Sequence, residues 1–322
     1  MISRHAIYRL LLYVLVVGLI GCSSVDEKTN SRDTYDWDAL TTDPHRPSPE
    51  QRFQARDNTT LVYRSYGAQA SIELILLHGS GFHSAYLSRL ATEIASSGIA
   101  RVWTPDIRGH GFRPQRRGDI DYIDQLEDDL ADFSAWLRAM NPQAELVIGG
   151  HSAGGGLTIR FAGGSYRDIA DGYLLLAPFL QYNAPTIRPQ LSGWATPKTS
   201  RIVALNLLNA LGIWSFNGIT TLEFKLPPRY RTGNETLAYS YRLMTGINPR
   251  NYASDLQALE KPTLVVVGTD DESYYADEFR SVFQEFSPQA QVELMPGATH
   301  LTLVVDAGLP PLVVQWLKRS FF

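Results

Sequence analysis

The sequence predicts an α/β fold in which a mostly parallel sheet is covered by helices on both faces. Its apolar segments lack polar alternation, which is typical of strands buried on both sides, and most are followed by a stretch with helical spacing. With 322 residues, 44% of them hydrophobic and 19% charged, the chain can form one large domain with a sizeable core, or two small ones.

The predicted elements begin with a β-hairpin and continue as an alternation of strands and helices. Asp57-Asn58 separates two alternating segments, 52–55 and 61–66, as in a hairpin turn. Buried strands are predicted at 72–77, 100–104, 145–149, 172–177, 263–267 and 291–295. Helices are predicted at 85–97, 122–140, 153–162, 276–286 and 311–319. The carboxyl ends of the parallel strands then share one edge, where open α/β sheets bind their ligands.

The alternation stops between residues 179 and 262. Connections of two to six residues are usual, so we interpret about 181–258 as a cap inserted before the strand at 263–267. The segment 201–216 is apolar on most faces, and 235–243 is predicted to form a second helix. We therefore expect a helical cap whose core includes Leu207, Leu211 and Trp214.

A serine motif stands between a predicted strand and a predicted helix. Residues 150–154 read Gly-His-Ser-Ala-Gly, and two more glycines follow, although each glycine costs a helix roughly 1 kcal/mol relative to alanine. The pattern Gly-x-Ser-x-Gly is by itself more often a glycine-rich turn. Between a strand and a helix it predicts a sharp, strained turn that exposes the hydroxyl of Ser152 as a nucleophile.

A serine nucleophile needs a base, an acid that orients the base, and donors for the oxyanion. His300 follows the last predicted strand, and Asp270 and Asp271 follow the strand before it. Residues 78–81, His-Gly-Ser-Gly, follow the first parallel strand and bring backbone N–H groups toward Ser152. All these segments are predicted to lie at the carboxyl edge of the sheet.

The order serine, aspartate, histidine with these placements resembles the α/β-hydrolase superfamily over residues 51–317. The motifs that carry the resemblance are His78-Gly79, residues 106–111, the serine turn, residues 268–271 and His300. The cap and the stretch Leu-Ala-Pro-Phe at 176–179 are similar to those of monoacylglycerol lipases and lysophospholipase-like serine hydrolases.

The resemblance implies a role for each candidate residue. Ser152 is the nucleophile, His300 the general base and acid, and Asp271 the orienting acid, with Asp270 as the alternative. The backbone N–H groups of Ser80 and Ala153 are expected to form the oxyanion hole. Relatives usually have an apolar residue soon after the acid, whereas this chain continues with Glu-Ser-Tyr-Tyr at 272–275.

The other polar residues of these motifs are expected to have local structural roles. His78 is expected to bond within its own loop, and His151 to pack or bond near the serine turn. Arg108 and His110 are expected to stabilise the loop that contains them.

The implied reaction is hydrolysis of a carboxylic ester through an acyl-enzyme, without a cofactor or a metal. Monoacylglycerols and lysophospholipids are candidate lipid substrates. Cleavage of amides or peptides by the same triad, and a membrane-tethered binding module without activity, remain open alternatives. A net charge of -4, a pI near 6.0 and the lack of a zinc-binding spacing or P-loop argue against a nucleic-acid partner. The acyl length, the alcohol and the oligomeric state are left open.

The N-terminal region predicts a signal peptide that ends at a lipidation site. An apolar run, 10–20, follows two arginines and is too short to span a bilayer, which takes about 20 residues. Leu-Ile-Gly-Cys at 19–22 resembles a bacterial lipobox and contains the only cysteine of the chain. We therefore expect residues 1–21 to be removed, Cys22 to carry palmitate and 22–49 to form a flexible tether.

The tether would hold the hydrolase domain, residues 50–322, close to a membrane. Ser23 is not the aspartate that typically retains such lipoproteins in the inner membrane, so we expect the outer membrane, with the domain facing the periplasm. An ordinary secretory signal or a short membrane anchor is the alternative interpretation of the same segment.

Overall fold

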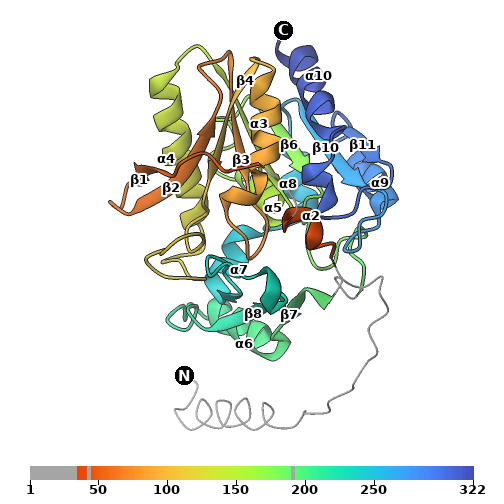
Figure 1. Cartoon of the computed structure of the whole chain (residues 1–322). Helices are drawn as coiled ribbons and strands as arrows, with labels where there is room; N and C mark the ends of the chain where they lie inside the picture. The colour runs from red at the N-terminus through yellow and green to blue at the C-terminus, as the bar shows by residue number, and fades with distance from the viewer. Residues whose placement is uncertain (1–34, 42–44, 190–192) are drawn as a thin grey trace, which may run out of the picture.

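The computed structural model describes residues 35–41, 45–189 and 193–322 (Figure 1). Its centre is an eight-stranded sheet with the order β1-β2-β4-β3-β5-β6-β10-β11. The strands are β1 (Gln51–Gln54), β2 (Thr60–Tyr66), β3 (Ile72–Leu77), β4 (Ala100–Pro105), β5 (Glu145–His151), β6 (Gly172–Leu176), β10 (Thr263–Gly268) and β11 (Gln291–Met295). Each of the predicted strands is present.

The register of the sheet brings the loops that carry the candidate residues to one edge. The hairpin β1–β2 and the pair β2–β4 are antiparallel, and the six strands from β4 to β11 are parallel. Leu77 at the end of β3 lies opposite Gly150 of β5, and Gly268 at the end of β10 lies opposite Met295 of β11. The loops after these four strands therefore meet at the carboxyl edge.

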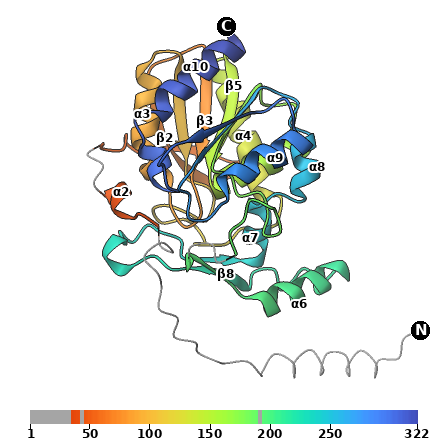
Figure 2. The same ribbon diagram turned by 90° about the vertical axis from the view of Figure 1, so that its right-hand side faces the viewer.

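Helices cover both faces of the sheet, as predicted (Figure 2). On one face α3 packs against α10, and on the other α4, α5, α8 and α9 form a continuous layer. The helices are α3 (Ser88–Ser96), α4 (Gln125–Met140), α5 (Ala153–Ala162), α8 (Tyr252–Gln257), α9 (Ala276–Phe286) and α10 (Leu309–Phe321). Every residue of β3 and of β10 is buried between the two layers.

The insertion contains a second, three-stranded antiparallel sheet. Its elements are β7 (Ala195–Pro197), α6 (Thr199–Ala210), β8 (Thr220–Phe224), β9 (Ala238–Ser240) and α7 (Tyr241–Ile247). The helix predicted at 235–243 is therefore wrong in its first half, which pairs with β8. The side chain of Ser240 accepts a hydrogen bond from the N–H of Leu243 and so caps a helix that begins only at Tyr241.

The helix α6 lies at the outside of the insertion (Figure 2). Leu205 is its only buried residue. Leu207, Leu211 and Trp214 are 60%, 74% and 67% exposed, so the prediction that they form the core of the cap is wrong. Apart from Leu205, the apolar residues of this segment are half-buried or exposed.

The described part of the predicted tether packs against the domain. Residues 35–41, here called the N-terminal strap, include the short helix α2 (Asp38–Thr41), which lies between the sheet and the insertion (Figure 1, Figure 2). Tyr35 and Trp37 are each only 8% exposed. Cys22 and the predicted signal lie outside the described residues, and no described helix is long and apolar enough to cross a membrane.

Candidate active site

Ser152 stands on a strained turn between β5 and α5. Its φ and ψ are 56° and -118°, a conformation that a residue with a Cβ adopts only at a cost of about 1 to 3 kcal/mol. Its N–H donates to the Leu176 carbonyl at 2.9 Å, and its carbonyl accepts from the N–H groups of Gly156 and Phe179, each at 3.0 Å. The two flanking elements thus hold Ser152 in this conformation.

The glycines around Ser152 are required by close backbone approaches. A Cβ on Gly150 would lie 2.3 Å from the carbonyl carbon of Gly154. A Cβ on Gly154 would lie 2.5 Å from the carbonyl oxygen of Leu77. The turn therefore excludes side chains at both positions, which explains why the sequence accepts residues that weaken a helix.

His300 and Asp271 form a buried hydrogen-bonded pair. Nδ1 of His300 lies 2.8 Å from Oδ2 of Asp271, and the two residues are 2% and 1% exposed. The second carboxylate oxygen of Asp271 accepts from the N–H groups of Ser273 at 2.8 Å and Tyr274 at 3.0 Å. Asp270 is exposed, so Asp271 is the carboxylate that contacts His300.

The backbone of His300 is held from two sides. Its N–H donates to a carboxylate oxygen of Glu272 at 2.9 Å, and its carbonyl is 3.0 Å from Nε2 of His151. Burial raises the pKa of Glu272 above its usual value. With Nδ1 of His300 donating to Asp271, Nε2 is left as the nitrogen with a free lone pair.

A chain of hydrogen bonds links the loop after β3 to the loop of His300. The N–H of Gly79 donates to the Tyr86 hydroxyl at 2.8 Å, and this hydroxyl lies 2.8 Å from Nδ1 of His151. Burial, together with the neighbouring His300, holds the pKa of His151 well below its usual range. His151 is therefore neutral, with Nδ1 accepting and Nε2 donating, and its predicted local role is confirmed.

The two predicted oxyanion donors are backbone groups near Ser152. Ala153 is the first residue of α5, where an N–H has no partner within the helix. A Cβ on Gly79 would lie 3.2 Å from the Cβ of Ser152, so the loop that contains Ser80 passes beside the serine. Within the described residues, the N–H groups of Ser80 and Ala153 donate to no protein acceptor.

Ser152 and His300 meet at the side chain of Tyr274. The Tyr274 hydroxyl interacts with the side chain of Ser152, and its ring meets the imidazole of His300 edge-on at 5.2 Å and 73°. Within the described residues, no direct hydrogen bond joins Ser152 to His300. Such contacts are often long without substrate and shorten in the complex.

Aromatic residues near His300 were not predicted from the sequence. Tyr35 stacks on the imidazole with ring centroids 5.1 Å apart and an interplanar angle of 17°. The only signals in the sequence were the aromatic residues of an otherwise polar segment and the unusual run 272–275.

The remaining histidines of the motifs are structural, as predicted. His78 Nε2 accepts from the N–H of Ile107 at 3.0 Å, and His110 Nε2 lies 2.6 Å from the Tyr239 hydroxyl. Burial lowers the pKa of both histidines to about 3. Arg108 forms two hydrogen bonds, of 2.6 and 2.7 Å, with the carboxylate of Asp129, which fixes its loop.

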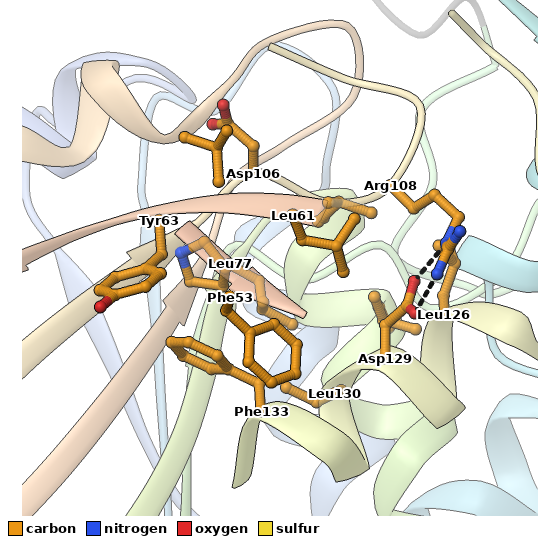
Figure 3. Close-up of a pocket in the computed structure, with 14 residues that line it drawn as sticks. Phe53, Leu61, Tyr63, Leu77, Asp106, Arg108, Leu126, Asp129, Leu130 and Phe133 are labelled. Carbon is orange, nitrogen blue, oxygen red and sulfur yellow. Dashed lines mark hydrogen bonds and ion pairs between the residues drawn. The ribbon is translucent and has the colours of Figure 1, made fainter. Parts of the chain in front are cut away.

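A separate cavity lies between the β1–β2 hairpin and α4 (Figure 3). Its volume of about 40 Å³ has room for a few water molecules. Ser152, Asp271 and His300 do not line it, so it is not the candidate site. The labelled lining residues are Phe53, Leu61, Tyr63, Leu77, Asp106, Arg108, Leu126, Asp129, Leu130 and Phe133.

The described ranges contain no cluster of histidine, cysteine, aspartate or glutamate side chains that could hold a metal ion. The arrangement around Ser152 provides a hydroxyl, an imidazole oriented by a carboxylate, and free backbone donors. These groups are suited to acyl transfer.

A family model described as serine aminopeptidase, S33, matches residues 68–306 of the chain. A monoacylglycerol lipase from Paleococcus ferrophilus is similar in structure, with 20% identity and a TM-score of 0.62 over 81% of this chain and 99% of that one. A soluble variant of monoglyceride lipase from Saccharomyces cerevisiae, solved with a substrate analogue, has 18% identity and a TM-score of 0.62 over 92% and 99%.

A thermophilic esterase from Thermogutta terrifontis is also similar, with 20% identity and a TM-score of 0.58 over 85% of this chain and 100% of that one. No curated protein sequence matches the chain at a significant level. At such identities the solved structures show a shared fold.

Proposed function

Because the chain belongs to the serine aminopeptidase S33 family of α/β hydrolases, we propose that it is a serine hydrolase that cleaves carboxylic esters. The observation that carries the proposal is the buried hydrogen bond between Asp271 and His300, next to the strained turn of Ser152. A carboxylate bound to Nδ1 orients the imidazole so that Nε2 can accept a proton.

The proposed reaction has two halves. Oγ of Ser152 attacks the carbonyl carbon of the ester while Nε2 of His300 takes its proton, and the N–H groups of Ser80 and Ala153 stabilise the oxyanion. His300 then protonates the leaving alcohol, which leaves an acyl group on Ser152. A water molecule, deprotonated by His300, attacks this acyl-enzyme and releases the acid and the free serine.

We propose esters with an apolar acyl chain as the substrate class, including monoacylglycerols and lysophospholipids. Support comes from aromatic side chains at the loop that carries Ser80, where Phe82 of this loop stacks with Trp194 of the insertion. The names of two structural relatives, a monoacylglycerol lipase and a monoglyceride lipase, agree with this class.

Labelling with a fluorophosphonate probe tests the proposed mechanism. We expect one covalent adduct on Ser152, lost in Ser152→Ala and strongly reduced in His300→Ala. Ser96→Ala, an exposed serine on α3, is the matched control and should label normally. A wild-type chain that is neither labelled nor active on any ester would contradict the proposal and favour a binding module.

A substrate panel separates ester from amide cleavage. We expect turnover of p-nitrophenyl esters and monoacylglycerols to exceed turnover of aminoacyl p-nitroanilides. The opposite ranking, with labelling intact, would replace the ester proposal by the amide or peptide alternative.

We also propose that Cys22 is lipidated and anchors the enzyme to the outer membrane, facing the periplasm. Support comes from the lipobox-like Leu-Ile-Gly-Cys at 19–22. Cys22→Ala should abolish palmitate incorporation and signal cleavage, whereas a chain that starts at Ser23 should be soluble and active on small esters. Wild-type protein that fractionates as soluble without palmitate would contradict the anchor and leave the hydrolase proposal untouched.

A further inference from the structure

We propose that the N-terminal strap completes the active site, with Tyr35 as a positioning residue for His300 and Trp37 as a wall of the substrate entrance. The proposal rests on the proposed serine hydrolase function. It assigns a catalytic contribution to a segment that is 265 residues away from His300 in the sequence.

The imidazole of His300 contacts two tyrosine rings, as well as the ring of His151 at 4.7 Å. Tyr35 covers one face in a stacked arrangement at 5.1 Å, and Tyr274 meets the ring edge-on at 5.2 Å. Asp271 holds Nδ1. Rotation of the imidazole would break the hydrogen bond and both ring contacts, so the three neighbours together fix the direction of Nε2.

Tyr35 is itself held by the loop that carries the acid. Its hydroxyl and the Ser273 hydroxyl share a hydrogen bond of 2.5 Å, and the N–H of Ser273 donates to Asp271. Ser273 is 1% exposed. The polar run after Asp271, which departs from the usual apolar residue, is thereby explained in part, because Ser273 in this run forms the hydrogen bond with Tyr35.

Trp37 connects the strap to the oxyanion loop and to the cap. Its ring lies 6.1 Å from Phe82, 5.0 Å from Trp194 and 6.3 Å from Tyr230. Asp38 accepts a hydrogen bond of 2.8 Å from the Tyr230 hydroxyl. Trp37 thus bridges the loop that carries Ser80 and two segments of the cap, and an apolar substrate chain that enters between this loop and the cap would meet Trp37.

The groups that face His300 are Asp271, Glu272, His151, Tyr274 and Tyr35 itself. Only Tyr35 belongs to the strap. Removal of its ring leaves one face of the imidazole uncovered, so kcat and the rate of labelling should fall while KM for a small ester changes little.

The first experiment compares Tyr35→Ala and Tyr35→Phe in the full chain, with p-nitrophenyl acetate and the fluorophosphonate probe. Tyr35→Ala should lower kcat and the labelling rate about three- to tenfold, the range of one aromatic pair, with little change in KM. Tyr35→Phe keeps the ring but removes the hydroxyl pair with Ser273, so its kcat and labelling rate should lie between those of Tyr35→Ala and wild type. Tyr182→Ala, which removes a tyrosine that is 77% exposed, is the matched control and should change neither quantity.

The second experiment tests whether Trp37 contacts the acyl chain of the substrate. Trp37→Ala should raise KM for long-chain p-nitrophenyl esters by about tenfold and leave KM for the acetate within about twofold. Equal effects on short and long esters would overturn the role of Trp37 as a wall.

The outcomes separate this inference from the proposed function. A labelled wild type, with Tyr35→Ala labelled equally fast and with an unchanged kcat, overturns the positioning role alone. A wild type that is not labelled overturns the hydrolase proposal, and the positioning role with it. Should Tyr35→Ala fail to fold, Tyr35→Leu carries the same test, because leucine retains apolar volume without an aromatic face.

Discussion

The N-terminal strap and the helix α6 are both apolar segments outside the main sheet, yet they are placed in opposite ways. Tyr35 and Trp37 are 8% exposed, whereas Leu211 and Trp214 are 74% and 67% exposed. The sequence predicted the reverse, a solvated tether and a packed cap. Apolar content alone therefore did not indicate which segment is buried.

The difference follows from the partners that each segment finds. The strap has polar atoms that pair with the rest of the domain, since Tyr35 bonds with the buried Ser273 and Asp38 with the half-buried Tyr230. Such pairs define one position and orientation for their rings. The segment around α6 presents mainly aliphatic side chains on its outer side, and only Leu205 is buried. Burial of an aromatic segment thus depends on matching polar contacts as well as on hydropathy.

The largest expected effect is a loss of activity in Ser152→Ala, which tests whether the site beside the strap is catalytic. Ser152→Ala should lower kcat/KM by about 10⁴-fold or more, because no other hydroxyl replaces the nucleophile, and should leave the unfolding free energy nearly unchanged. Steady-state kinetics and urea unfolding measure the two quantities. Ser80→Ala is the control and should retain activity, since its proposed donor is a backbone N–H. A Ser152→Ala variant that keeps even one tenth of the activity would remove Ser152 from the nucleophile role.

The next effect measures the burial of the strap directly. Trp37→Ala should lower the unfolding free energy by up to about 3 kcal/mol, less than for a tryptophan in the central core, because the strap can detach locally. Urea denaturation followed by circular dichroism gives the global value, and hydrogen exchange of residues 35–41 gives the local one. Unchanged protection of these amides in the variant would show that Trp37 does not hold the strap.

A pH titration tests the loops at the carboxyl edge of the sheet, which contain buried histidines, whereas α6 contains none. Burial lowers the pKa of His110 from 6.5 to about 3, so the unfolded chain binds more protons between these values. Stability should therefore fall as pH drops below 6.5, by roughly 2 kcal/mol for this residue at pH 5. His110→Asn should flatten the dependence measured by urea unfolding. An equal slope in both proteins would exclude this histidine as its source.

The smallest change in stability is expected for the exposed segment around α6. Trp214→Ala should change the unfolding free energy by no more than about 0.5 kcal/mol, although it removes the same side chain as Trp37→Ala. Thermal and urea unfolding of the two tryptophan variants, measured side by side, test the contrast. A loss in Trp214→Ala as large as in Trp37→Ala would mean that the surface around Trp214, four residues after the end of α6, is covered in solution.

The main sheet could be predicted because each strand has a local signal. The strand 72–77 and the helices 153–162 and 276–286 begin and end where the pattern predicted them. The same holds for the contact between Asp271 and His300, since both residues directly follow strands whose ends share an edge. Contacts between loops that follow adjacent strands can therefore be predicted from the sequence.

The remaining features depend on contacts between distant segments. The stacking of Tyr35 on His300 depends on a hydroxyl pair with Ser273, which no periodicity indicates. In the insertion, the capping contact of Ser240 moves the start of a helix and leaves the residues before it free to pair as β9. Both outcomes were set by single polar side chains.

The position of Tyr35 also limits how far the active site can lie from the proposed membrane anchor. With Cys22 anchored as proposed, only about a dozen residues separate the lipid from a ring that is fixed on His300, and a fully extended chain of that length spans at most about 45 Å. The active site would then stay within about 45 Å of the bilayer surface. Esters that diffuse beyond this distance would be out of reach, whereas those leaving the membrane would pass within it.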